Sequence, residues 1–229
     1  MNILAIGPHP DDIEFGCSPL LIREARAGNR VHLLILSRGE AGSAGTPELR
    51  EQESRAAAQL IGASIDFLDF AGDCHLQYTS ENAFKIAAEI RKLKPAIVLA
   101  PHPQENQHPD HAAAGKLVRD ACRFARYGGL HELNALPVHR VANLLFYNIT
   151  QHLQKPDLVF DISDLLADWE AVMNCHQSQV KSKGYIELQK SGARLLGLTI
   201  GVEYALGLFA NDPVRLETIS DLKLSSRNF

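Results

Sequence analysis

Three ionisable side chains stand within four positions of one another near the start of the chain. His9, Asp11 and Asp12 lie in the segment GPHPDDIEFG (7–16), directly after the apolar run NILAI at 2–6. Such groups are costly to bury unless a site uses them. His9 and Asp12 are three positions apart, so in a turn or a first helical turn their side chains project to one side. This pattern predicts a functional site where the first buried run ends.

A second polar cluster, HPQENQHPDH, follows the apolar run at 96–100 and ends at His111. His108 and His111 repeat the three-residue spacing, and Pro109 suits the first position of a helix. Two imidazoles and one carboxylate make a three-ligand zinc set that leaves a fourth position for water, as in catalytic rather than structural sites. The spacing does not decide which of the two histidines is the ligand. Asp11 stays free beside the ion, where it can take a proton from water whose pKa the zinc lowers to ~7.

The elements that must position these clusters alternate through the first half of the chain. Local signals support helices, since Thr46 suits an N-cap, Ser80 can cap the third helix and Gly62 suits the C-terminal end of the second. This alternation predicts an α/β fold, a three-layer αβα arrangement around a mostly parallel, twisted sheet. The expected strands are 2–6, 31–36, 65–70 and 96–100, and the expected helices are 13–28, 47–62, 80–94 and 109–126.

The second half adds further elements without a linker or an internal repeat, so we expect one domain over residues 1–229. We expect a Rossmann-like strand order of 3-2-1-4-5 with C-terminal additions. In such a sheet, strands one and four are neighbours across the topological switch point, where ligands bind. Both polar clusters would then reach the same crevice. The added elements are strands at 143–147 and 158–162, a helix at 163–180, and a segment at 204–209 that suits a helix end or a strand.

Composition and charge exclude several classes of protein. Of the 229 residues, 45% are hydrophobic and 22% are charged, with a net charge of −4, which argues against a nucleic-acid partner. Apolar runs fall short of the ~20 residues that cross a bilayer, and the N-terminus lacks the pattern of a signal peptide. We therefore expect a cytoplasmic protein that binds no membrane. The cysteines are expected to be free thiols, because no C-x-x-C occurs among Cys17, Cys74, Cys122 and Cys175.

The paired motifs HPDD and HPDH, in this order, resemble those of the LmbE/PIG-L family of zinc-dependent N-deacetylases. The segments GEAGSAGTPELR (39–50) and HQSQ (176–179) resemble the family as well. Two features depart from the family's pattern: Ser18-Pro19-Leu20 stands where Gly-Gly-Thr is often found, and Gln107 stands where arginine is common. These departures leave the motif residues intact and bear on substrate preference.

The resemblance implies a metal site and a base. His9, Asp12 and His111 would hold the metal, and Asp11 would be the general base. The implied ion is Zn²⁺, although Fe²⁺ or Co²⁺ can occupy a site of this kind.

The resemblance also implies roles for residues around the metal. His108 would stabilise the oxyanion of the tetrahedral intermediate, with Asp110 fixing its orientation and favouring the imidazolium form. Arg50 matches a position that lines the substrate pocket. Tyr185, in the segment KGY, matches an aromatic residue near the oxyanion.

The implied reaction is hydrolysis of the N-acetyl group of an N-acetylglucosamine conjugate by metal-activated water. Within the family the chain most resembles the bacillithiol-biosynthesis group, whose substrate is N-acetylglucosaminyl-malate, and chito-oligosaccharides stay open. The partner would thus be a small acetylated amino-sugar conjugate. The resemblance further suggests a homo-oligomer, for example a hexamer. Two alternatives are a metal-dependent phosphoesterase and a non-catalytic sugar-binding or nucleotide-binding module on the same fold.

Overall fold

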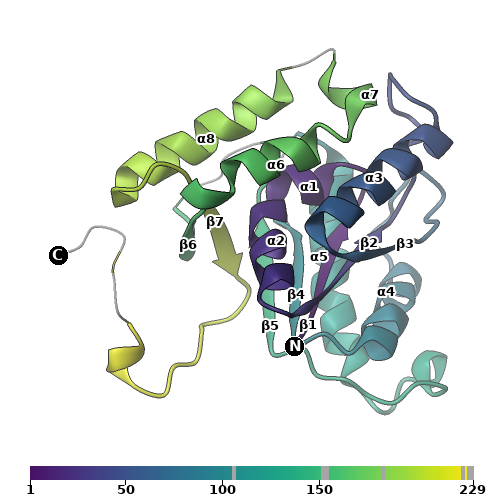
Figure 1. Cartoon of the computed structure of the whole chain (residues 1–229). Coiled ribbons are helices and arrows are strands. Elements are labelled where there is room, and N and C mark those ends of the chain that lie inside the picture. The colour runs from purple at the N-terminus through teal and green to yellow at the C-terminus, as the bar shows by residue number, and fades with distance from the viewer. Residues whose placement is uncertain (105–106, 151–154, 182–183, 223–224, 226–229) are drawn as a thin grey trace.

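A seven-stranded sheet forms the centre of the molecule (Figure 1). The structure is a computed structural model, and it describes residues 1–104, 107–150, 155–181, 184–222 and 225. The strand order is β3-β2-β1-β4-β5-β7-β6, which confirms the expected Rossmann-like order 3-2-1-4-5. The strands are β1 (Asn2–Gly7), β2 (Arg30–Ile35), β3 (Ser64–Phe67), β4 (Ile97–Pro101), β5 (Asn143–Tyr147), β6 (Leu158–Asp161) and β7 (Ala205–Ala210).

The first five strands are parallel, and the C-terminal additions are not. β7 is antiparallel to both of its neighbours, β5 and β6. The segment at 204–209, which the sequence left open, is therefore mostly the strand β7. The sheet remains mainly parallel, as expected, with an antiparallel edge.

Helices cover both faces of the sheet (Figure 1). Because successive side chains of a strand point to opposite faces, Ile3 and Ala5 of β1 pack into one core while Leu4 and Ile6 pack into the other. The first core also contains side chains of α2, α3 and α6, and the second contains those of α4 and α5. The helices are α1 (Asp12–Gly16), α2 (Ser18–Arg26), α3 (Pro47–Ile61), α4 (Ser80–Leu93), α5 (Pro109–Ala125), α6 (Leu166–Met173), α7 (Gln177–Val180) and α8 (Tyr185–Ile200), with short 3₁₀ turns at His131–Leu133, Ser163–Leu165 and Ile219–Asp221.

The first expected helix is broken in two. The segment 13–28 divides at Cys17 into α1 and α2, and Pro19 occupies the first turn of α2. Proline lacks a backbone N–H and its ring clashes with the preceding turn, so it is tolerated at a helix start and not in the interior. A single helix through Pro19 would therefore be strained, and the break removes that strain.

Three other boundaries differ from the sequence-based expectations. The expected helix 163–180 divides into a 3₁₀ turn, α6 and α7, and the sequence pattern did not predict α8. Thr79, rather than Ser80, caps α4, because its side chain accepts a hydrogen bond from the Asn82 N–H. The cap at Thr46 and the left-handed end of α3 at Gly62 (φ 81°) are as expected. Among the described residues, no helix is long and apolar enough to span a bilayer.

Candidate active site

The two polar clusters meet because β1 and β4 are hydrogen-bonded neighbours. Ile3 of β1 aligns with Ile97 of β4, so the loops after these parallel strands leave the same end of the sheet. A pocket of about 260 Å³ opens there. Seven of the sequence-predicted residues border it, and the eighth, Asp110, contacts His9 just behind it. The seven are His9, Asp11, Asp12, Arg50, His108, His111 and Tyr185.

Asp12 lies between two histidines that come from different loops. One carboxylate oxygen is 3.0 Å from Nδ1 of His9, and the other is 3.1 Å from Nε2 of His111. All three side chains are buried. Burial raises the pKa of the Asp12 carboxyl, but the charges and hydrogen bonds of His111 and His9 outweigh burial and bring the pKa below its ordinary value. Asp12 is therefore an anion shared by two imidazoles.

The donor set fits a divalent metal such as zinc. In a tetrahedral site with metal–ligand distances of ~2.0–2.1 Å, two ligand atoms lie roughly 3.3 Å apart. The contacts of Asp12 with His9 and His111, made by its two different oxygens at 3.0 and 3.1 Å, lie close to this value. The structure also gathers two overlapping groups of donor atoms that lie within 4.8 Å of one another. They are His9, His108 and His111, and His9, Asp73, His108 and Asp110.

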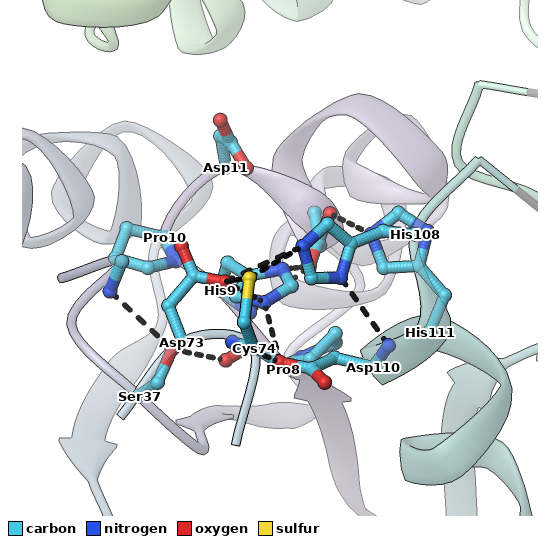
Figure 2. Close-up of polar contacts among 12 residues, drawn as sticks. Pro8, His9, Pro10, Asp11, Ser37, Asp73, Cys74, His108, Asp110 and His111 are labelled. Atoms are coloured by element: carbon cyan, nitrogen blue, oxygen red, sulfur yellow. Dashed lines mark hydrogen bonds and ion pairs between the residues drawn. The ribbon is translucent and has the colours of Figure 1, made fainter. Parts of the chain in front are cut away.

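The second ring nitrogen of His9 faces two carboxylates (Figure 2). Nε2 is 3.1 Å from Asp73 Oδ1 and 3.2 Å from Asp110 Oδ2. Burial alone lowers the pKa of His9, but Asp12, Asp110 and Asp73 outweigh it and raise the pKa well above the ordinary value. These carboxylates fix the ring, in the way that outer partners orient metal-binding histidines.

Asp11 stands apart from this cluster and has an unusual backbone. In Figure 2 its carboxylate points away from His9, and its φ of 107° lies in the left-handed region, which is strained for a residue with a Cβ. Burial, and then the negative charge of Asp12, raise the pKa of Asp11 to about 7, although Arg50 opposes the shift. A carboxyl group with this pKa can exchange a proton at neutral pH.

Arg50 is buried and holds the HPDD loop against α3. Its guanidinium donates to the carbonyl oxygens of Pro10 (2.8 Å) and Gly39 (3.0 Å), and it lies 3.4 Å from Asp11 Oδ2. Gly39 has φ 68°, and a Cβ there would lie 1.8 Å from Arg50 Nη1, so only glycine fits. Arg50 borders the pocket, but its two Nη atoms are engaged inside the protein and its Nε is buried.

His108 caps α5, and its ring nitrogens have different partners. Nδ1 accepts a hydrogen bond from the backbone N–H of Asp110 (3.2 Å), while Nε2 is 3.4 Å from Asp73 Oδ1. The Asp110 carboxylate points instead to His9 and to the Cys74 N–H (2.8 Å). Burial and then His9 lower the pKa of His108, despite Asp110 and Asp73. The charge of Asp110 thus favours the imidazolium form of His108, but burial and His9 outweigh it, and the Asp110 carboxylate contacts His9 rather than the His108 ring.

Sequence reasoning missed Asp73 and Cys74, which follow β3 and enter the site from a third loop. Burial opposes ionisation of Asp73, but the hydrogen bond and charge of His9 lower its pKa to about 2. Desolvation and the carboxylates of Asp73 and Asp110 raise the pKa of the Cys74 thiol. The polar segment GDCH (72–75), which follows a strand, was the only signal for them. The sequence did not show that this loop would fold over the site.

The HQSQ segment (176–179) reaches the pocket through Gln179. Ser178 donates from its backbone N–H (2.8 Å) and its hydroxyl (2.6 Å) to the buried carboxylate of Glu53. Gln179 donates to the Ala44 carbonyl oxygen (2.9 Å) in the loop 38–46 and borders the pocket. Tyr185, at the start of α8, also borders the pocket and packs edge-on against Phe15, with ring centroids 6.1 Å apart.

A Rossmann-like sheet with histidine and carboxylate donors at its switch point defines a class, the metal-dependent hydrolytic enzymes. Residues 4–122 match the family described as "PIG-L: GlcNAc-PI de-N-acetylase". The chain belongs to this PIG-L/LmbE family of metal-dependent deacetylases.

Three curated relatives show how broad the family is. The chain is 34% identical to the diacetylchitobiose deacetylase of Thermococcus kodakarensis, over 78% of this chain and 70% of the relative. It is 25% identical to the 4-oxalmesaconate hydratase of Pseudomonas putida, over 90% and 88% of the two chains. It is 26% identical to the probable N-acetyl-alpha-D-glucosaminyl L-malate deacetylase 2 of Bacillus cereus, over 79% and 84%.

Solved structures show the same fold. A conserved protein of Thermus thermophilus superposes with a TM-score of 0.82 at 33% identity, covering 93% of this chain and 96% of the other.

Proposed function

We propose that the chain removes the N-acetyl group from a small N-acetylglucosamine conjugate by metal-assisted hydrolysis. The observation that carries the proposal is the convergence of the two motifs. Asp12 contacts both His9 and His111, while Asp11 and His108 border the same pocket. His9, Asp12 and His111 would hold the ion, which we propose to be Zn²⁺. When bound, such an ion polarises a carbonyl oxygen and lowers the pKa of water to ~7.

Asp11 is the proposed general base. It borders the pocket without contacting the His9 cluster, and Arg50 holds its loop from behind. A carboxyl group whose pKa is raised can take the proton of the attacking water and return it to the leaving amine. The strained φ of Asp11 holds the carboxylate on the pocket side, and such strain is typical of positions that function requires.

His108 is the proposed oxyanion partner, and its hydrogen bonds indicate how it would act. Because Nδ1 accepts the Asp110 N–H, a neutral ring carries its proton on Nε2. Nε2 can therefore donate to the developing oxyanion without the ring being an imidazolium. A preorganised donor of this kind contributes roughly 3–4 kcal/mol to the transition state.

The charge of the pocket bears on the substrate. Among the described residues that border it, Arg50 is the single lysine or arginine; its two Nη atoms are engaged by Pro10, Gly39 and Asp11, and its Nε is buried. Arg38, which could also bind an anionic group of a substrate, is paired with Glu51 at 3.1 Å. We therefore place uncharged conjugates such as diacetylchitobiose ahead of N-acetylglucosaminyl-malate. The 34% identity to a diacetylchitobiose deacetylase supports the same order.

The test is acetate release by the metal-loaded chain from diacetylchitobiose, N-acetylglucosamine and N-acetylglucosaminyl-malate. We expect the neutral disaccharide to be hydrolysed with a higher kcat/KM than the malate conjugate. A chelator should abolish activity, and Zn²⁺, Fe²⁺ or Co²⁺ added separately should show which ion restores it best. Acetate release that survives chelation would contradict the metal-assisted mechanism.

The same assays separate the alternatives. Hydrolysis of bis(p-nitrophenyl) phosphate without acetate release from any amide would favour a phosphoesterase. Sugar binding without turnover would favour a non-catalytic module. Hydration of an unsaturated dicarboxylate, measured as loss of its ultraviolet absorbance, would favour the activity for which the relative from Pseudomonas putida is named.

A further inference from the structure

Three donor atoms of different kinds face one another at the rim of the pocket (Figure 2). Cys74 Sγ is 3.4 Å from Asp73 Oδ1 and 3.5 Å from His108 Nε2, and these oxygen and nitrogen atoms are themselves 3.4 Å apart. Cys74 is exposed, so the face formed by the three atoms is open to ions from solution.

The triangle has the dimensions of one face of a zinc tetrahedron. With Zn–S of ~2.3 Å and Zn–N or Zn–O of ~2.0–2.1 Å, the sulfur edges are roughly 3.5 Å and the nitrogen–oxygen edge is roughly 3.3 Å. The observed separations of 3.4 and 3.5 Å agree with these edges. An ion can therefore contact all three atoms without a shift of the backbone.

The backbone around Cys74 holds this geometry. Its φ is 67°, in the left-handed region, and its N–H donates to Asp110 Oδ2 at 2.8 Å. Asp73 is fixed by His9 at 3.1 Å, and its N–H donates to Glu40 Oε2 at 2.9 Å. The triad shares no residue with the set His9, Asp12 and His111.

We propose that Cys74, Asp73 and His108 form a second cation site, one that takes Zn²⁺ or another thiophilic divalent ion and inhibits the enzyme. The inhibitory role rests on the proposed function, because an ion at this site removes His108 from its place beside the oxyanion. The binding of the ion does not depend on the proposed function. Water fills the fourth position of the ion.

Proton balance makes this site weaker than the first. The thiol releases its proton to solvent when sulfur binds the ion. The Nε2 proton of neutral His108 must also leave, and Nδ1 must take up a proton, at the cost of the 3.2 Å hydrogen bond from Asp110 N–H. The first site therefore fills before the second, and inhibition begins only when more than one equivalent of the ion per chain is present.

Cobalt(II) reports the sulfur ligand without any substrate. The metal-free chain is titrated with Co²⁺, and a thiolate-to-cobalt charge-transfer band in the near ultraviolet should appear during the second equivalent. Cys74→Ser should lose the band, and Asp73→Asn should weaken binding of the second Co²⁺ by more than the roughly 10- to 100-fold that an outer-shell partner costs. Cys175→Ser, which alters a half-buried thiol away from the triad, should keep it. No band in the wild type, or a band that survives in Cys74→Ser, overturns the proposal.

Activity measurements separate this proposal from the proposed function. Excess Zn²⁺ should inhibit the wild type and Cys175→Ser, whereas Cys74→Ser should resist, each measured relative to its own activity at one equivalent. Equal inhibition of all three contradicts the inhibitory role. A cobalt–thiolate band without acetate release from any substrate leaves the second site standing and defeats the deacetylase proposal. Acetate release without the cobalt–thiolate band supports the deacetylase proposal and defeats the second site.

Discussion

At the residue scale, two adjacent aspartates have opposite surroundings. Asp12 opens α1 and lies between His9 and His111, whereas Asp11 has a left-handed backbone and lies on the pocket side near Arg50. The surroundings favour the anion of Asp12 and raise the pKa of Asp11. Neighbouring positions in the sequence thus acquire the properties of a ligand and of a base.

The ligand assignment predicts the behaviour of Asp12→Ala. The variant should bind far less zinc, because it keeps only the two imidazoles of the proposed three-ligand set. The measurement is elemental analysis after dialysis, with Asp157→Ala, which lies outside the pocket, as the control. A full equivalent of zinc in Asp12→Ala would show that the residue is no ligand.

The base assignment predicts a different result for Asp11→Asn. Zinc content should stay near one equivalent, while kcat should fall roughly 100-fold or more, since general-base catalysis contributes 10²–10⁴-fold. Steady-state acetate release and metal content, measured on the same preparation, test both parts. Turnover near the wild-type rate would refute the role of Asp11.

A buried pair behind the pocket predicts a pH-dependent stability. His176 Nε2 lies 3.3 Å from Glu14 Oε1 without hydrogen-bond alignment, and both side chains are fully buried. Burial lowers the pKa of His176, but the charge of Glu14 outweighs it and the pKa is raised. A raised histidine pKa gives stability that is fully present below the unfolded pKa of about 6.5 and is lost as pH rises through the folded pKa.

His176→Leu should therefore lower the free energy of unfolding by about 3 kcal/mol at low pH, because it leaves Glu14 buried without its partner. The difference from the wild type should shrink as pH increases from 6 to 9. Urea denaturation across this range measures it, with His131→Leu as the control, since the side chain of His131 is 88% exposed. A difference that grows with pH would contradict the pairing.

At the element scale, the loop 38–46 depends on contacts from two helices, the one that follows it and one that is distant in the sequence. Arg50 of α3 holds it at Gly39, and Gln179 of α7 holds it at Ala44. Gly45 (φ 82°) passes so close to Ser178 that a Cβ would lie 2.8 Å from the serine Cβ. The glycine-rich segment is thus a fitted wall of the pocket, which its composition alone did not show.

Gln179→Ala should loosen this wall. Loss of a hydrogen bond worth about 1 kcal/mol predicts a KM increase of roughly 5-fold with kcat nearly unchanged. Gln177→Ala is the matched control, because Gln177 lies on the same short helix, is exposed and bonds only to the Asn174 carbonyl among the described contacts. An equal effect of both variants, or a fall in kcat alone, would contradict the role of Gln179.

The peripheral helix α8 bears on assembly (Figure 1). Leu195 and Leu198 are 67% and 62% exposed and three positions apart, so they share a face. We propose that the chain forms a homo-oligomer and that the assembly buries this face. Replacing both leucines by glutamate should weaken association by more than about 100-fold, since each buried leucine contributes about 1.5–3 kcal/mol. Sedimentation equilibrium measures this, with Leu60→Glu on α3 as the control, and a wild-type mass of a single 25.2 kDa chain would contradict it.

At the scale of the whole molecule, the fold does not depend on the metal as a zinc finger does. The two apolar cores on either face of the sheet contain none of the proposed metal ligands. Metal removal should therefore lower Tm and leave a cooperatively folded chain. At a zinc concentration 1,000 times Kd, binding adds about 4 kcal/mol, or roughly 10 °C. Calorimetry with and without chelator tests this, and unfolding of the apo form at 25 °C would contradict it.

The sequence determined the parallel part of the fold and the members of the site that are local. Alternating apolar runs and helix signals predict five strands in the order 3-2-1-4-5, because strand and helix periodicity are properties of short segments. His9 with Asp12, and His108 with His111, are likewise joined by spacing within one turn. The order of the strands then indicated that the two loops meet.

The tertiary structure alone decided which atoms face one another across loops. Asp73 and Cys74 enter the site from the loop after β3, and the Asp110 carboxylate faces His9 rather than His108, since side-chain direction depends on packing that sequence spacing does not encode. The same holds for Arg50, whose charge is engaged by the HPDD loop instead of the pocket. Contacts between segments distant along the chain form only when the whole sheet brings them together, which is why local patterns could name the motifs but not complete the site.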